Sequence, residues 1–196
     1  MSGDHASTPV AARVRRLEER LIEAGLVSDA ELDDIVARYL AGASPLNGAR
    51  IVARAWTDDG FRARLLRDAN AAIPELGLSM RGGLQEQRLK VVANTRERHN
   101  VVVCTLCSCY PISLLGPSPS WYKSEAYRSR VVREPRAVLG EFGLGLPEDV
   151  EITVWDSSAE SRYFVLPLRP ADTAELTEEK LAELVTREGL IGTAAV

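Results

Sequence analysis

The apolar positions over the first forty residues recur at helical intervals. Pro9 is placed to open a helix that Gly25 ends. A second helix follows, because Ser28 and Glu31 form a capping-box pattern ahead of further apolar residues. The apolar residues of the two stretches are Leu17, Leu21, Ile22, Leu32, Ile35, Val36 and Leu40. Two short amphipathic helices bury little surface alone, so we expect residues 1–44 to form a helical N-terminal arm that lies on something else, such as another chain.

Residues 45–70 repeat the helical pattern, with a kink predicted at residues 57–60. The apolar residues that carry this pattern are Ile51, Val52, Trp56, Phe61, Leu65 and Leu66. After a predicted loop over 77–83, the spacing of the apolar residues no longer follows the helical period. Residues 89–93 and 100–103 are short runs rich in β-branched side chains, and they predict two strands.

The next part of the chain is irregular and then helical. Residues 111–119 contain three prolines and a glycine, which predicts irregular structure. Ser120 is placed to cap a helix over 122–132, and Pro135 opens a further helix that ends near Gly143.

Two strands and a helix complete the pattern. Residues 151–155 and 162–166 alternate like strands, and Thr177 is placed to cap a last helix that ends before Gly189. This order of helices and strands predicts an α+β or layered α/β domain over residues 45–196, behind the arm.

Composition excludes several classes of protein. The chain has 196 residues and a mass of 21.4 kDa, enough for one domain with an arm. A net charge of −4 argues against nucleic acid or an anionic membrane as a partner. No apolar run approaches the ~20 residues that cross a bilayer. The polar stretch before Pro9 lacks the pattern of a signal peptide, so we expect a cytoplasmic protein.

All three cysteines lie between residues 104 and 109, which we name the cysteine loop. An odd and clustered set is a poor disulfide framework. The Cys107 sulfur and the Ser108 main-chain nitrogen would close a six-membered chelate ring on a metal. Two five-membered rings would follow, through the Ser108 and Cys109 nitrogens and through the nitrogen and sulfur of Cys109. Cys104 would add an axial thiolate, with one octahedral position open. Because two amides must lose protons, this claw points to a trivalent ion.

Two simpler interpretations remain open on spacing alone. A structural zinc site would use the three cysteines with His99, although one residue between Cys107 and Cys109 crowds a tetrahedron. A redox pair of Cys104 and Cys107 fits the C-x-x-C pattern but leaves Cys109 without a role.

The loop sequence V-C-T-L-C-S-C over 103–109 resembles the metal-binding motif of the nitrile hydratase α subunit. Further segments match that family in order and spacing, and the match covers about positions 45 to 192. These segments are V-A-R-A-W over 52–56, W-Y-K over 121–123, Y-R-S-R-V-V-R-E-P-R over 127–136, W-D over 155–156, R-Y-F-V-L-P over 162–167 and I-G over 191–192.

The resemblance implies a role for each loop residue within an α-β-β-α type metal-binding domain. Cys104 is the axial thiolate, Cys107 becomes a sulfinate and Cys109 a sulfenate. The main-chain nitrogens of Ser108 and Cys109 are the remaining ligands. Thr105 is similar to the branch that uses non-corrin Co(III), with Fe(III) as the alternative.

Outside the loop the resemblance is less uniform. Gln85 matches in spacing a glutamine that lies near the substrate in some members, although a solvated loop glutamine is the more ordinary interpretation. The family commonly has P-W-P-x-L-G-L-P-P after the motif, whereas this chain has P-I-S-L-L-G-P-S-P over 111–119. Ile112 therefore replaces a tryptophan, which predicts an unusual substrate pocket.

The expected function is a lyase reaction that hydrates a nitrile to an amide. Water activated at the site and the Cys109 sulfenate oxygen remain alternative nucleophiles. Residues 101–122 contain no Lys or Arg, so we expect a β-type partner to supply arginines to the negatively charged site, and an activator protein to load the metal. The metal-binding subunit of thiocyanate hydrolase is an alternative, and a non-catalytic zinc or redox-sensing module is an alternative of another class.

Several charged residues have ordinary expected roles. We expect His99 to be a surface histidine, and Asp156 to form an ion pair with Arg162 at the strand ends. A basic stretch on the helix predicted over 122–132 and beyond reads as a solvated or ion-paired face, which in this family would also suit a partner chain. It consists of Arg128, Arg130, Arg133 and Arg136.

Overall fold

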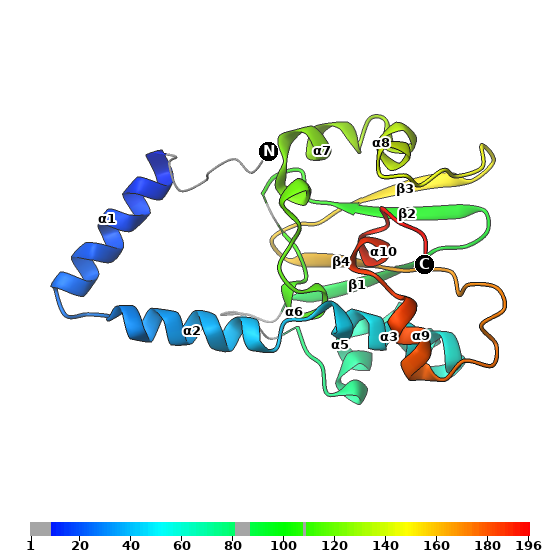
Figure 1. The fold of residues 1–196 in the computed structure, drawn as a ribbon, viewed down its shortest axis with the longest axis horizontal. Coiled ribbons are helices and arrows are strands. Elements are labelled where there is room, and N and C mark those ends of the chain that lie inside the picture. The colour runs from blue at the N-terminus through cyan, green and yellow to red at the C-terminus, as the bar shows by residue number, and fades with distance from the viewer. Residues whose placement is uncertain (1–8, 81–86, 108) are drawn as a thin grey trace. The chain divides into compact units, whose positions relative to one another are not determined.

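The computed structural model describes residues 9–80, 87–107 and 109–196, which form two compact units that divide after Gly42 (Figure 1). The first unit contains α1 (Pro9–Glu23) and α2 (Asp29–Ala41). The capping box is confirmed, since the Ser28 side chain accepts from the Glu31 N–H and the Glu31 carboxylate accepts from the Ser28 N–H. No residue of α1 is buried. The functional division at residues 44 and 45 stays a prediction.

The second unit begins with helices that follow the predicted pattern. These are α3 (Pro45–Thr57), α4 (Asp59–Arg67) and α5 (Ala69–Ala72), followed by a 3-10 turn over Ile73–Leu76. The predicted kink is a complete break, because Asp58 has extended backbone angles and its carboxylate accepts from the Phe61 N–H to cap α4.

The four predicted strands are present and pair across long stretches of sequence. β1 (Arg88–Ala93) lies parallel to β4 (Ser161–Leu166), and β2 (Arg98–Val103) lies parallel to β3 (Glu151–Asp156). Strands that are adjacent in sequence therefore belong to different two-stranded sheets. This mixture of helices and parallel strands confirms the predicted mixed α/β class.

The helix predicted over 122–132 begins later than expected. Ser120–Lys123 forms a 3-10 turn, and Ser124 caps α7 (Glu125–Arg130) by accepting from the Tyr127 N–H. Ser124 has extended backbone angles, which a helical residue lacks, so the chain turns there. The predicted helix at Pro135 is confirmed as α8 (Pro135–Glu141).

Two further stretches differ from the prediction. The segment predicted to be irregular contains a single helical turn, α6 (Ile112–Leu115), in which the Leu115 and Gly116 N–H groups donate to the Pro111 and Ile112 carbonyls. The last predicted helix is two helices, α9 (Glu178–Leu184) and α10 (Arg187–Ile191). Val185 is extended, and Thr186 caps the second helix through the Gly189 N–H.

The core of the second unit forms where the helices pack closely against one another and against the strands. Gly48 on α3 makes one such approach, since a Cβ at this position would lie 2.6 Å from Leu190 Cδ1 and 3.0 Å from the Leu114 carbonyl oxygen. The largest fully buried side chains come from helices and strands alike: Tyr122, Phe61, Phe164, Ile51, Leu65 and Ile73. Among the described residues, no helix is long and apolar enough to cross a membrane.

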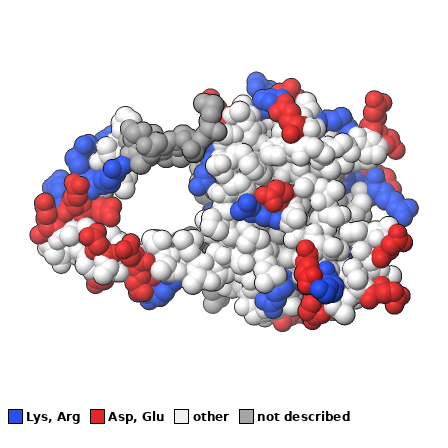
Figure 2. All heavy atoms as spheres, in the orientation of Figure 1, with Lys and Arg blue, Asp and Glu red and all other residues white. Residues whose placement is uncertain are grey.

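On the face shown in Figure 2, Lys and Arg side chains alternate with Asp and Glu side chains over the second unit. This mixed distribution agrees with the small net charge of −4.

Candidate metal centre

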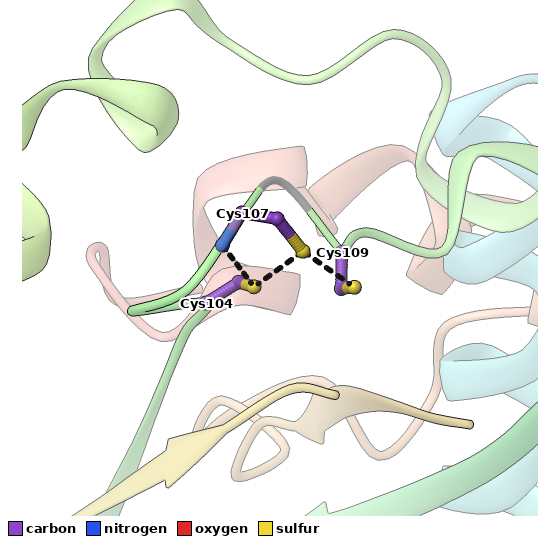
Figure 3. Close-up of side chains that lie close together, drawn as sticks. All are labelled: Cys104, Cys107 and Cys109. Atoms are coloured by element: carbon purple, nitrogen blue, oxygen red, sulfur yellow. Dashed lines mark hydrogen bonds between the residues drawn. The ribbon is translucent and has the colours of Figure 1, made fainter. Parts of the chain in front are cut away.

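The cysteine loop begins where β2 ends, and Val103 is paired with Asp156 at the end of β3. The Sγ atoms of Cys104, Cys107 and Cys109 all lie within 4.8 Å of one another. The Cys104 and Cys107 sulfurs are 3.4 Å apart, and those of Cys107 and Cys109 are 3.1 Å apart (Figure 3). The structure thus brings together the three predicted thiolate ligands.

The donor set fits a thiophilic metal ion. All three cysteines are free thiols, and Cys104 and Cys109 are buried whereas Cys107 is exposed. Soft thiolates gathered at this separation favour a transition metal over a hard cation. Two further predicted site residues, Ser108 and Gln85, lie outside the described residues.

Burial governs the chemistry of the metal-free thiols. It raises the pKa of the Cys109 thiol to about 12, with a further contribution from the bond with Cys107, and the positive charge of Arg162 acts against this rise. Metal binding must therefore displace a proton that Cys109 holds firmly at neutral pH.

His99 is not the surface histidine predicted from the sequence. It is buried, its Nε2 lies 2.7 Å from the Gly192 carbonyl oxygen, and its Nδ1 lies 3.2 Å from the Asn94 side-chain nitrogen. Because both ring nitrogens are bonded to other groups, His99 is not available as the fourth ligand of a zinc site.

Asp156 anchors one side of the cysteine loop. Its carboxylate oxygens accept from the main-chain N–H of Thr105, at 2.9 Å, and from the Thr105 hydroxyl. The predicted ion pair between Asp156 and Arg162 is wrong, because Arg162 donates instead to the carbonyl oxygens of Ser158 and Ser161. The Asp156 carboxylate therefore bonds to the cysteine loop and not to Arg162 on β4.

Side chains from residues 122–128 hold three carbonyl groups in and beside the cysteine loop. The hydroxyl of Tyr127 donates to the Val102 carbonyl at 2.7 Å, and that of Tyr122 donates to the Cys109 carbonyl at 3.1 Å. Arg128 donates from its guanidinium to the Cys107 carbonyl at 3.1 Å. Sequence reasoning missed all three contacts, because nothing in the local pattern shows which carbonyl a tyrosine or arginine will reach.

The basic stretch divides into different roles. Arg130 pairs with Glu134 and Glu141, as predicted for an ion-paired face. Arg128, in contrast, contacts the cysteine loop. The absence of Lys and Arg from residues 101–122 is a fact of the sequence, yet the fold brings Arg128 and Arg162 to the loop from elsewhere in the chain. The Nε atoms of both arginines are buried and have no hydrogen-bond partner within the described part of the chain.

Residues 8–194 match the model of the family described as "nitrile hydratase, alpha chain". The chain belongs to the nitrile hydratase α-chain family. The low-molecular weight cobalt-containing nitrile hydratase subunit alpha of Rhodococcus rhodochrous is 54% identical over 183 residues, which is 93% of this chain and 87% of that protein.

Solved structures and a related enzyme extend the nitrile hydratase comparison. A double mutant of the Fe-type nitrile hydratase from Comamonas testosteroni Ni1 matches with a TM-score of 0.87 and 43% identity, over 98% of this chain and 92% of that chain. The thiocyanate hydrolase subunit gamma of Thiobacillus thioparus is 44% identical over 186 residues, covering 91% of this chain and 76% of that protein. The likeness confirms the resemblance drawn from the cysteine motif.

Proposed function

We propose that this chain is the metal-bearing α subunit of a nitrile hydratase that hydrates a nitrile to the amide at a non-corrin Co(III) centre. The observation that carries the proposal is the gathering of three free cysteine sulfurs within 4.8 Å on the motif of this family. Cobalt is favoured over Fe(III) by Thr105 and by the cobalt-containing relative at 54% identity, whereas the Fe-type structure is 43% identical.

The loop residues have separate tasks in this proposal. The sulfurs of Cys104, Cys107 and Cys109 and the main-chain nitrogens of Ser108 and Cys109 would hold the ion. When bound, a trivalent ion supplies Lewis-acid polarisation of the nitrile carbon. In the mature enzyme Cys107 would be a sulfinate and Cys109 a sulfenate, an oxidation that requires an external oxidant such as dioxygen. Either water or the Cys109 sulfenate oxygen would attack the nitrile carbon.

A β-type partner subunit completes the site. Leu106 in the cysteine loop is 87% exposed and Cys107 is also exposed, so the outer side of the loop has no cover within the described residues. An apolar side chain beside a charged centre favours a partner that covers the loop and adds arginines to it. A separate activator protein loads the metal. A cytoplasmic location fits, because a reducing compartment keeps the thiols available for loading.

Thiocyanate hydrolase activity is the second candidate. It is supported by the 44% identity to a subunit of that enzyme. Ile112, where the α-subunit motif commonly has tryptophan, favours an unusual substrate in either reaction. This position follows the loop by three residues, so a changed side chain there changes the surroundings of the metal.

The test produces the chain together with its β-type partner in cobalt-supplemented medium. We expect stoichiometric cobalt, amide from added nitriles, and a gain of three oxygen atoms in the peptide that spans Cys104 to Cys109 by mass spectrometry. Ammonia and carbonyl sulfide from thiocyanate, without amide from nitriles, would identify the second candidate. Stoichiometric zinc with unmodified thiols would contradict both.

A further inference from the structure

Arg128 makes the contact on which the inference rests. One terminal nitrogen of its guanidinium donates to the Cys107 carbonyl oxygen at 3.1 Å. Its Nε is buried and has no hydrogen-bond partner in the described structure. The side chain also lines a hollow of about 360 Å³ beside the loop, together with Thr105, Glu125, Ser129 and Val132. A cationic side chain with an unused buried donor therefore lies against the cysteine loop.

The carbonyl group that Arg128 holds belongs to the peptide that contributes a proposed ligand. The Cys107 carbonyl carbon is bonded to the main-chain nitrogen of Ser108. Because the peptide group is planar and conjugated, a donor fixed on its oxygen restricts rotation of the plane that contains this nitrogen. The same conjugation spreads negative charge from a ligating nitrogen onto the oxygen, where a guanidinium stabilises it most directly.

Contacts of other residues hold α7 in place, so the bond from Arg128 to the cysteine loop is not needed to support the helix. The hydroxyl of the buried Tyr127 bonds the Val102 carbonyl, and Ser124 caps α7, so both hold the helix without Arg128. Trp121 and Tyr127 also pack edge to face, with ring centroids 4.9 Å apart. Glu125 lines the same hollow as Arg128, but no described carboxylate forms an ion pair with the guanidinium.

We propose that Arg128 is a positioning residue of the metal centre, which orients the peptide between Cys107 and Ser108 for ligation and offsets part of the negative charge of the ligands. This inference rests on the proposed function. It means that this chain supplies a cation to the centre from its own helix, in addition to the arginines expected from the partner.

The experiment compares Arg128→Met, Arg128→Gln and Arg128→Lys with the wild type, each produced with the partner and cobalt. The exposed Arg133 provides the control Arg133→Met. The readouts are cobalt per complex, cobalt retained against a chelator, the sulfur-to-metal absorption bands, and the melting temperature of the complex. Loss of a group that supports metal ligands typically costs about 10- to 100-fold in affinity.

We expect Arg128→Met to lose cobalt to the chelator about 10- to 100-fold more readily than the wild type. Arg128→Gln keeps a neutral donor, and Arg128→Lys keeps the charge without the planar guanidinium. The cobalt retention of both is therefore expected to lie between that of Arg128→Met and that of the wild type. Shifted absorption bands in Arg128→Met would accompany the loss, and Arg133→Met is expected to match the wild type.

Either of two results would overturn the inference. Wild-type cobalt retention and absorption bands in Arg128→Met overturn it. If Arg128→Met lowers the melting temperature, the comparison passes to Arg128→Gln and Arg128→Lys, and equal cobalt retention in these two and the wild type overturns it as well. A wild-type complex without cobalt contradicts the proposed function instead, which keeps the two failures distinct.

Discussion

Single side chains hold the cysteine loop and the end of the chain in place through hydrogen bonds whose directions are fixed. Asn94 illustrates this, because its side-chain oxygen accepts from the Asn100 N–H at 2.8 Å. Its nitrogen must then face His99, which makes His99 Nδ1 an acceptor and leaves the Nε2–H to donate to the Gly192 carbonyl. The network therefore requires a neutral imidazole.

The neutral His99 predicts pH-dependent stability. Burial lowers its pKa from the ordinary value, and the bond to the Gly192 carbonyl acts only partly against this. The unfolded chain binds a proton near pH 6.5, where the folded chain does not, so the free energy of unfolding falls as the pH drops below this value. Urea unfolding between pH 7.5 and 5.5 measures the slope, and His99→Gln is expected to reduce it. An unchanged slope in that variant would refute the assignment.

Asp156 predicts a second effect at the residue scale. Asp156→Ala removes both acceptors from Thr105, whereas Asp156→Asn keeps one for the main-chain N–H. We expect Asp156→Ala to lower the free energy of unfolding by about 1 kcal/mol and to loosen cobalt retention, with Asp156→Asn closer to the wild type. Urea unfolding and cobalt analysis check this, and wild-type stability and cobalt retention in Asp156→Ala would show that the hydrogen bonds to Thr105 are unimportant.

At the scale of the elements, some contacts require a residue without a side chain. Gly192 follows α10 with φ +91°, and a Cβ there would lie 2.0 Å from the Asn100 carbonyl oxygen on β2. The chain after α10 can approach β2 this closely only because the residue is glycine. Since β2 leads directly into Cys104, this approach also supports the strand that presents the proposed metal ligands.

Gly192→Ala is therefore expected to destabilise the chain strongly. It combines backbone strain with a collision against main chain, together about 2 kcal/mol or more. Gly143→Ala is the matched control, because Gly143 also has a positive φ, of +84°, but nothing lies within 4 Å of its added Cβ. Thermal unfolding of both variants separates strain from collision, and equal losses would exclude the collision as the larger cause.

At the scale of the whole molecule, the two units differ because only the second has a hydrophobic core. Every buried residue of the described chain lies after Gly42, and α1 exposes Val10, Val14, Leu17 and Leu21 on its surface. Apolar side chains at this spacing lie along one side of a helix. A helix of this kind gains stability when a partner covers it, which fits a heteromeric enzyme.

Removal of residues 1–42 tests this division. We expect the melting temperature of the isolated chain to remain unchanged, since the core is retained, while association with the β-type partner weakens. Thermal unfolding and analytical ultracentrifugation measure the two effects. A large fall in the melting temperature would show that the arm contributes to the stability of the chain by itself.

The sequence by itself predicted a thiolate metal site in the cysteine loop and determined most of the local elements. Ligand type and chelate ring size depend on covalent spacing, and the Ser28 capping box and the Asp58 break depend on neighbouring residues. The tertiary structure alone decided which distant groups meet. Thr105 and Asp156 are 51 residues apart, and Cys107 and Arg128 are 21 apart, so packing of the whole second unit sets their contact. The same packing buried His99, because no local pattern records which segment will cover a side chain.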